Sequence, residues 1–319
     1  MANFNSPQKV FIKSKNNVKK ILNNYNISLI IFSLLAIISN LLIHNNELVV
    51  LFIKSLIKSL FITIIISYIF NIIKKEYSIK KLYTEDNTIF IAIVLSLFSI
   101  NTNIYISILA IFTTILIKNI FKKINTSSVL YGILIIIVYK YLTNNINVEL
   151  ILTNKDNIIK YLFDIKYLCP IISIVGFIYL FYHKSIKYNL VFSYLLTFIT
   201  IMLGYGIFNN FDLYFPINEL LNSSIVFLAI YTLTDYKVTP TINEGRTIYG
   251  IILGIISAIL RFIIPSIAII ITLILGPLLT NKIDKISPKL KYNNKMYTGI
   301  IISSIIVMII TSFILTIAF

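Results

Sequence analysis

The stretch TLTDYKVTPTINEGRTIYG, residues 232–250, places a carboxylate, a proline, a glycine and a guanidinium between two apolar runs. Asp235 and Arg246 are spaced so that they could contact each other across this connection. A guanidinium held there can also bind a phosphate or carbonyl oxygen of a ligand or partner, because its donors form a planar fork. The alternative is an ordinary turn whose backbone angles are set by Pro240 and Gly245. The candidate binding residues are therefore Thr234, Asp235, Gly245 and Arg246.

Other reactive patterns are missing from the sequence. His, Cys and carboxylate residues do not share metal-ligand spacing, and His44 and His183 lie at the ends of separate apolar runs. The single cysteine, Cys169, excludes an internal disulfide and an all-cysteine cluster site. Only nine glycines occur in 319 residues, and none forms a phosphate-binding glycine-rich loop. We therefore expect no catalytic residues and no metal site, and a chain that is not catalytic on its own.

The elements that must position these residues are membrane helices. Hydrophobic residues make up 58% of the chain and the mean hydropathy is +0.90, well above the values of soluble domains. Long apolar segments in lipid must be helical, because only a helix satisfies its own backbone groups there. The sequence predicts an all-α polytopic membrane protein with ten or eleven transmembrane helices, near 27–43, 48–73, 88–100, 104–120, 129–142, 168–183, 188–208, 220–235, 247–264, 267–279 and 296–318.

Basic residues fall mainly on one side of these predicted helices. If the N-terminus is cytoplasmic, 21 of the 28 Lys and Arg residues lie in cytoplasmic segments, as the positive-inside rule requires. The net charge of +16 is then explained by the bilayer, without a nucleic-acid partner. Residues 1–26 are polar and basic, so we expect no removable signal peptide there. We expect a multi-pass protein of the inner or plasma membrane with a cytoplasmic, basic N-terminus over residues 1–26.

The predicted helices divide into two sets of five that begin on opposite faces. The first set covers 27–142 and the second 168–280, with an extracytoplasmic loop at 143–167 and a basic loop and extra helix at 281–319. This layout predicts two inverted five-helix repeats. The third helix of each set is short, and paired short helices indicate a central site between the repeats. The alternative is that both are merely tilted or trimmed helices.

The opening stretch also resembles a known family. Asp235, Pro240, Gly245 and Arg246 match the spacing of an Asp, a Pro-Val-Thr-Ser-Pro segment and a Gly-Arg pair in the D subunit of the Rnf electron-transport complex. The B subunit of the sodium-translocating NADH:quinone oxidoreductase shares this pattern. LGPLLTNKID, ending at Asp284, is similar to the family's helix ending in Pro-Leu-Ile-Asp. The similarity covers roughly residues 5 to 284.

The resemblance implies further candidate residues and a flavin. It implies cofactor-binding positions at Asp86, Asn87, Lys118 and Asn125, and it implies covalent FMN on a loop threonine, for which Thr153 is the nearest candidate. The alternative for Thr153 is an ordinary loop residue, because the small residues that precede the family's threonine are missing. The family's Gly-Gly pair is also replaced by Lys122 and Lys123. FMN or riboflavin is thus the expected cofactor.

Three functions follow as expectations. The resemblance implies a membrane subunit of an Rnf-type complex that couples electron transfer between ferredoxin and NAD to Na⁺ or H⁺ transport, with the other subunits as partners. A non-redox transporter or channel on the same inverted-repeat fold, related in architecture to urea channels, is the alternative. A structural anchor that has lost its flavin lies between these two.

Overall fold

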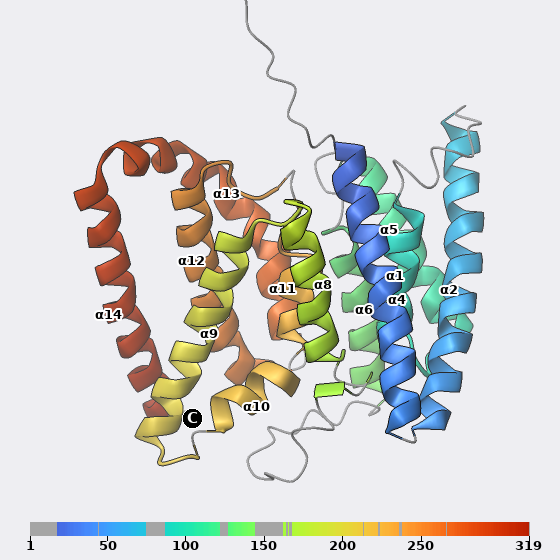
Figure 1. Cartoon of the computed structure of the whole chain (residues 1–319), viewed down its shortest axis with the longest axis horizontal. Coiled ribbons are helices and arrows are strands. Elements are labelled where there is room, and N and C mark those ends of the chain that lie inside the picture. Colours follow the sequence, from blue (N-terminus) through green and yellow to red (C-terminus); the bar gives the residue numbers. More distant parts are fainter. Residues whose placement is uncertain are drawn as a thin grey trace, which may run out of the picture.

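Apolar helices account for the structure, a computed structural model that describes residues 18–43, 45–74, 87–121, 127–143, 162–163, 165, 168–212, 214–222, 224–235, 238–265 and 267–318. No strand occurs in these ranges (Figure 1). The helices are α1 (Val18–Leu42), α2 (Asn46–Ile73), α4 (Thr88–Phe98), α5 (Ile104–Ile120), α6 (Val129–Leu142), α8 (Pro170–Tyr182), α9 (Tyr188–Phe208), α10 (Phe215–Asn222), α11 (Ile225–Tyr231), α12 (Asn243–Ile263), α13 (Ala268–Tyr292) and α14 (Asn294–Ala318).

Five of these helices are long and apolar enough to cross a bilayer, namely α1, α2, α9, α12 and α14. The expected multi-pass, all-helical membrane protein is thereby confirmed. Shorter apolar helices are α4, α5, α6 and α8. Since an α-helix rises about 1.5 Å per residue, the 11 residues of α4 cover only about 17 Å, roughly half of the hydrocarbon core. Several of the predicted transmembrane helices therefore reach only part of the way across.

The structure places three helix ends differently from the apolar runs. Helix α1 begins at Val18, well before residue 27, because Leu22 and Tyr25 are already buried. The run at 220–235 is divided between α10 and the seven-residue α11. Helix α13 continues past residue 279, through Pro277 and Pro288. A stripe of buried residues at helical spacing continues along this extension, at Thr280, Ile283, Ser287 and Leu290.

Two polar contacts mark the two ends of α1. Near the C-terminal end of α1, the Asn40 amide donates to the backbone oxygen of Phe163 at 3.0 Å. Near its N-terminal end, the Tyr25 hydroxyl hydrogen-bonds the Thr234 hydroxyl. Fifteen residues of helix, about 22 Å, separate Tyr25 from Asn40. Phe163 and Thr234 therefore lie near opposite ends of α1.

The two shortest apolar helices lie in the protein interior. All seven residues of α11 are buried, and nearly all of α4 is buried. Helix α14, in contrast, packs on α9 and α12 at one edge of the bundle and is mostly exposed (Figure 1). The two half-length helices α4 and α11 thus end among protein groups.

Candidate functional site

The connection between α11 and α12 forms a buried polar cluster. The last carbonyls of a helix lack partners within the helix, and those of α11 lie inside the protein because all seven of its residues are buried. The Thr232 hydroxyl donates to the Leu228 carbonyl at 2.7 Å, and the Thr234 hydroxyl donates to the Ile230 carbonyl at 2.9 Å. The two threonines thus close the end of the helix and leave Asp235 as the next side chain.

Asp235 is buried, with 2% of its surface exposed, yet its carboxylate is well supported. Its Oδ2 atom accepts the backbone N–H of Ser127 at 3.1 Å and the Ser127 hydroxyl at 3.0 Å. Ser127 lies just before α6, where the exposed N–H groups of a helix start favour a negative charge. The backbone oxygen of Asp235 accepts the Thr239 hydroxyl at 2.8 Å, which bends the chain back on itself. Asp235 therefore fixes the end of α11 to the beginning of α6.

Arg246 does not make the predicted contact with Asp235 among the residues that the structure describes. Its Nε donates to the Pro240 carbonyl at 3.0 Å, and its two terminal nitrogens donate to the Thr241 carbonyl at 2.7 Å and the Asn243 side chain at 2.8 Å. The physical reason is that each group has other hydrogen-bond partners. The Arg246 guanidinium donates to loop carbonyls, and the Asp235 carboxylate accepts from Ser127. Arg246 thus closes its own loop.

Gly245 allows a neighbouring helix to approach closely. It lies in the first turn of α12, and a Cβ atom there would lie 2.9 Å from the Ser287 Cβ atom on α13. The neighbour that approaches is therefore a protein helix. Packing of α12 on α13 accounts for the glycine without a ligand.

Two groups that the sequence did not single out complete the charge pattern. Lys187, directly before α9, donates from Nζ to the Thr239 hydroxyl. The pKa of Lys187 is lowered to about 8, mainly by burial and also by the positive charge of Arg246, while Asp235 and Asp284 act in the opposite direction. Asp284 of α13 accepts the backbone N–H of Thr241 at 3.1 Å. Two cations and two carboxylates from separate segments therefore surround one loop.

These partners were missed for a physical reason. Asp284 ends the LGPLLTNKID segment that carries the family resemblance, so a signal existed for it, whereas Ser127 lies where the sequence departs from the family pattern. Neither was predicted as a site residue. Lys187 looks like any other interfacial lysine in the sequence, and Tyr25 looks like one of many aromatic residues in apolar runs. Only folding brings these four side chains to the 232–246 connection.

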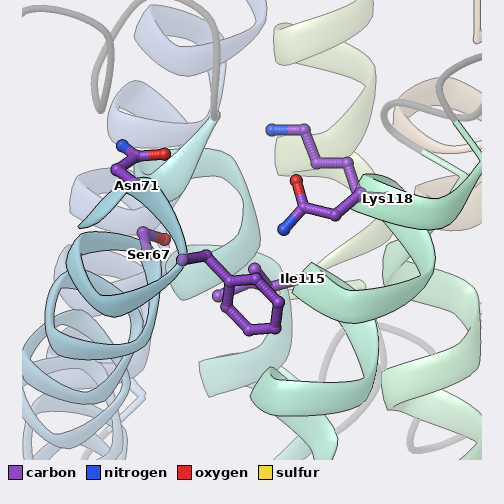
Figure 2. Close-up of a pocket in the computed structure, with 6 residues that line it drawn as sticks. Ser67, Asn71, Ile115 and Lys118 are labelled. Atoms are coloured by element: carbon purple, nitrogen blue, oxygen red, sulfur yellow. The ribbon is translucent and has the colours of Figure 1, made fainter. Parts of the chain in front are cut away.

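The remaining predicted residues lie elsewhere or outside the described ranges. Lys118, on α5, lines a small pocket with residues of α2 (Figure 2). Asn87 precedes α4 with a left-handed backbone, φ 48°, and is 1% exposed. Its amide nitrogen and oxygen have no hydrogen-bond partner in the part of the chain that the structure describes. Outside that part lie Asp86, Asn125 and Thr153.

Half-length helices that end in buried polar groups within a bundle of membrane helices define a class of protein. They are typical of membrane proteins, transporters above all, in which interrupted helices end near the middle of the bilayer. The chain belongs to the NQR2, RnfD, RnfE family, whose model matches residues 5–293. The suspected family is thereby confirmed, and the match ends directly before α14, which begins at Asn294. No curated protein sequence matches the chain.

Proposed function

We propose that this chain is the membrane subunit of an Rnf-type complex that couples electron transfer between ferredoxin and NAD to the movement of Na⁺ or H⁺. The observation that carries the proposal is the family match over residues 5–293. The chain would lie in the plasma or inner membrane with its N-terminus in the cytoplasm, because the basic residues gather at that end of the helices. Other subunits of the complex would supply and remove the electrons, since the described part of the chain holds no group of His, Cys, Asp and Glu residues that could bind a metal ion.

Two inverted repeats are part of this proposal, with α1, α2, α4, α5 and α6 in one and α8, α9, α11, α12 and α13 in the other. Helix packing supports the division. In each set the second helix packs on the third and fourth, and the fourth packs on the fifth. The two first helices pack on each other, as do the two fifth helices, which a pseudo-two-fold axis between the sets requires.

The starts of the short helices support the same division. Asn87 before α4 and Ser224 before α11 both have left-handed backbones, with φ of 48° and 55°. Left-handed conformations are uncommon outside glycine, so their occurrence at matched positions favours a common origin for the two sets.

A flavin, FMN or riboflavin, is the cofactor that we propose. Asn87 fits such a group, because its buried amide offers a donor and an acceptor that no described residue uses. When bound, the flavin would supply the electron-carrying chemistry. The protein's own residues would bind it, exclude water and hold the surrounding charges in place. Covalent attachment at Thr153 remains a separate proposal.

One experiment addresses the flavin and its attachment together. The complex is purified in mild detergent, and the chain is examined for flavin fluorescence in a denaturing gel and for a mass shift in the peptide that contains Thr153. A Thr153→Val variant should abolish fluorescence in the denaturing gel if the attachment is covalent. Fluorescence that survives this substitution would contradict attachment at Thr153, and a colourless native complex would contradict the flavin itself.

A non-redox transporter is the second candidate, favoured by the missing small residues before Thr153 and by Lys122 and Lys123 in place of Gly-Gly. This candidate predicts solute or ion flux through the purified chain in proteoliposomes without an electron donor. A chain that had become a structural anchor would give neither flux nor flavin. The three outcomes are therefore distinguishable.

A further inference from the structure

The ends of α2 and α5 form a pocket with lysines from both helices at or beside it. Its lining residues are Ser67, Phe70, Asn71, Ile115, Lys118 and Asn119, and we call it the α2–α5 pocket. In Figure 2, Asn71 and Lys118 face each other across the opening, with Ser67 and Ile115 deeper inside. The pocket itself holds only a water-sized group, so any larger ligand must sit at its mouth.

A second lysine reaches the same mouth. Lys74, which caps α2, donates from Nζ to the Asn119 side-chain oxygen at 2.6 Å. Two ammonium groups and two amides therefore converge from two helices. The only acidic residue in α2 and α5 is Glu47, at the far end of α2, about 40 Å along the helix from Lys74.

The walls of the pocket continue into a lipid-facing apolar surface. Phe70 packs against Phe112 of α5 with ring centroids 5.8 Å apart, and Phe112 is 44% exposed. Ile69 and Ile73 of α2 are also exposed, at 49% and 70%. In a membrane protein, such side chains contact acyl chains. A ligand at the mouth would therefore meet positive charge at one end and apolar surface at the other.

We propose that the α2–α5 pocket binds the headgroup of an anionic phospholipid. One phosphate oxygen points into the pocket towards Ser67 and Asn71, while the lysines pair with the phosphate charge. The acyl chains lie along Phe112 and the exposed isoleucines of α2. Basic pockets between membrane helices at a charged membrane surface bind anionic lipids by this combination. The proposal is independent of the redox function.

Native mass spectrometry of the full chain, titrated with phosphatidylglycerol or phosphatidylcholine, tests the site. The wild type should retain one phosphatidylglycerol more tightly than phosphatidylcholine. The double variant Lys74→Gln/Lys118→Gln should weaken that binding about 30-fold, since each surface lysine contributes a factor of about five. The matched control Lys289→Gln/Lys291→Gln removes the same charge from exposed positions on α13 and should leave it unchanged.

Two further arms decide between the remaining outcomes. Lys74→Arg/Lys118→Arg should bind phosphatidylglycerol as the wild type does, which separates charge from side-chain packing and helix capping. Millimolar inorganic phosphate should not displace the lipid. The proposal is overturned if the α13 control weakens binding equally, if the wild type holds phosphatidylcholine as tightly, or if free phosphate displaces the lipid. The comparison with phosphatidylcholine and the phosphate displacement need only wild-type protein. The test therefore remains decisive even if a variant fails to fold.

Discussion

Oδ2 of Asp235 accepts both the backbone N–H and the hydroxyl of Ser127, at 3.1 Å and 3.0 Å. The two residues are 108 positions apart in the chain, and each lies at the end of a different short helix. This contact therefore joins the two sets of helices at the connection where the other charged groups gather. A carboxylate so placed serves both as a structural link and as a fixed negative charge inside the bundle.

Replacement of Asp235 tests that link. Asp235→Ala leaves a buried N–H and a hydroxyl of Ser127 without their acceptor, which costs about 1–3 kcal/mol of stability. Asp235→Asn keeps an acceptor oxygen and should cost less. Thermal unfolding of the detergent-solubilised chain measures both, and equal melting temperatures for wild type and Asp235→Ala would contradict the link.

Lys187 should titrate far below an ordinary lysine. Its half-buried ammonium has a pKa of about 8, so the amine becomes neutral and reactive above pH 8. Labelling with an amine-specific reagent, followed by mass spectrometry across pH, should give a midpoint near 8 for Lys187. Exposed Lys289 serves as the reference, and a shared midpoint would contradict the buried setting.

The same lowered pKa sets a pH dependence of stability. In the folded state Lys187 loses its proton at a lower pH than in the unfolded chain, so the unfolded chain binds more protons between pH 8 and 10.5. The contribution of this lysine to stability should therefore rise with pH across that window. A Lys187→Met variant should lack this rise in stability between pH 8 and 10.5. Identical profiles of stability against pH for variant and wild type would contradict the contribution of Lys187.

The ion pair of Glu219 on α10 and Arg261 on α12 is buried at a separate place. Arg261 Nε and Glu219 Oε2 are 2.9 Å apart, and both side chains are at most 3% exposed. Glu219→Ala leaves a guanidinium buried without its partner, which should cost about 3–5 kcal/mol. The double variant Glu219→Leu/Arg261→Met should recover most of that loss in the same unfolding measurement. A double variant no more stable than Glu219→Ala would argue against an uncompensated charge as the cause.

Gly176 has a matched control elsewhere in the chain. A Cβ atom at Gly176 would lie 2.0 Å from the Tyr231 hydroxyl oxygen and 2.9 Å from the Ser28 hydroxyl oxygen. A Cβ atom at Gly299 on α14 would have no neighbouring atom of the described residues within 4 Å. Gly176→Ala should therefore destabilise by about 1–3 kcal/mol through overpacking, and Gly299→Ala should not. Adding Tyr231→Phe to Gly176→Ala should restore part of the loss. Equal melting temperatures for the two alanine variants would refute the close packing.

The helical membrane architecture could be predicted because long apolar runs in lipid leave the backbone few alternatives. The short length of α4 could also be predicted, because its apolar run in the sequence is short. The break between α10 and α11 was not predicted, although the polar residues Asn222, Ser223 and Ser224 mark it in the sequence, because 220–235 was taken as a single transmembrane helix. The extension of α13 past Pro288 depends on burial of Ser287 and Leu290 against neighbours, which a hydropathy pattern does not contain.

The candidate site was predictable to the extent that polar residues between apolar runs are rare. Asp235 and Arg246 were found in this way, but their mutual contact was not formed. Each has an alternative partner, Ser127 for one and the Thr241 carbonyl for the other. Such partners depend on tertiary packing, and nothing in the spacing of Asp235 and Arg246 reveals them.

Coupled electron and ion transfer by a complex that contains this chain is the central claim. Uptake of Na⁺ or H⁺ into inside-out membrane vesicles, driven by reduced ferredoxin and NAD, tests it most directly. We predict uptake that requires both the electron donor and the chain, and that is lost in membranes lacking the chain and regained on its re-expression. Donor-driven uptake that persists without the chain, or ion flux through the purified chain with no donor present, would contradict the account.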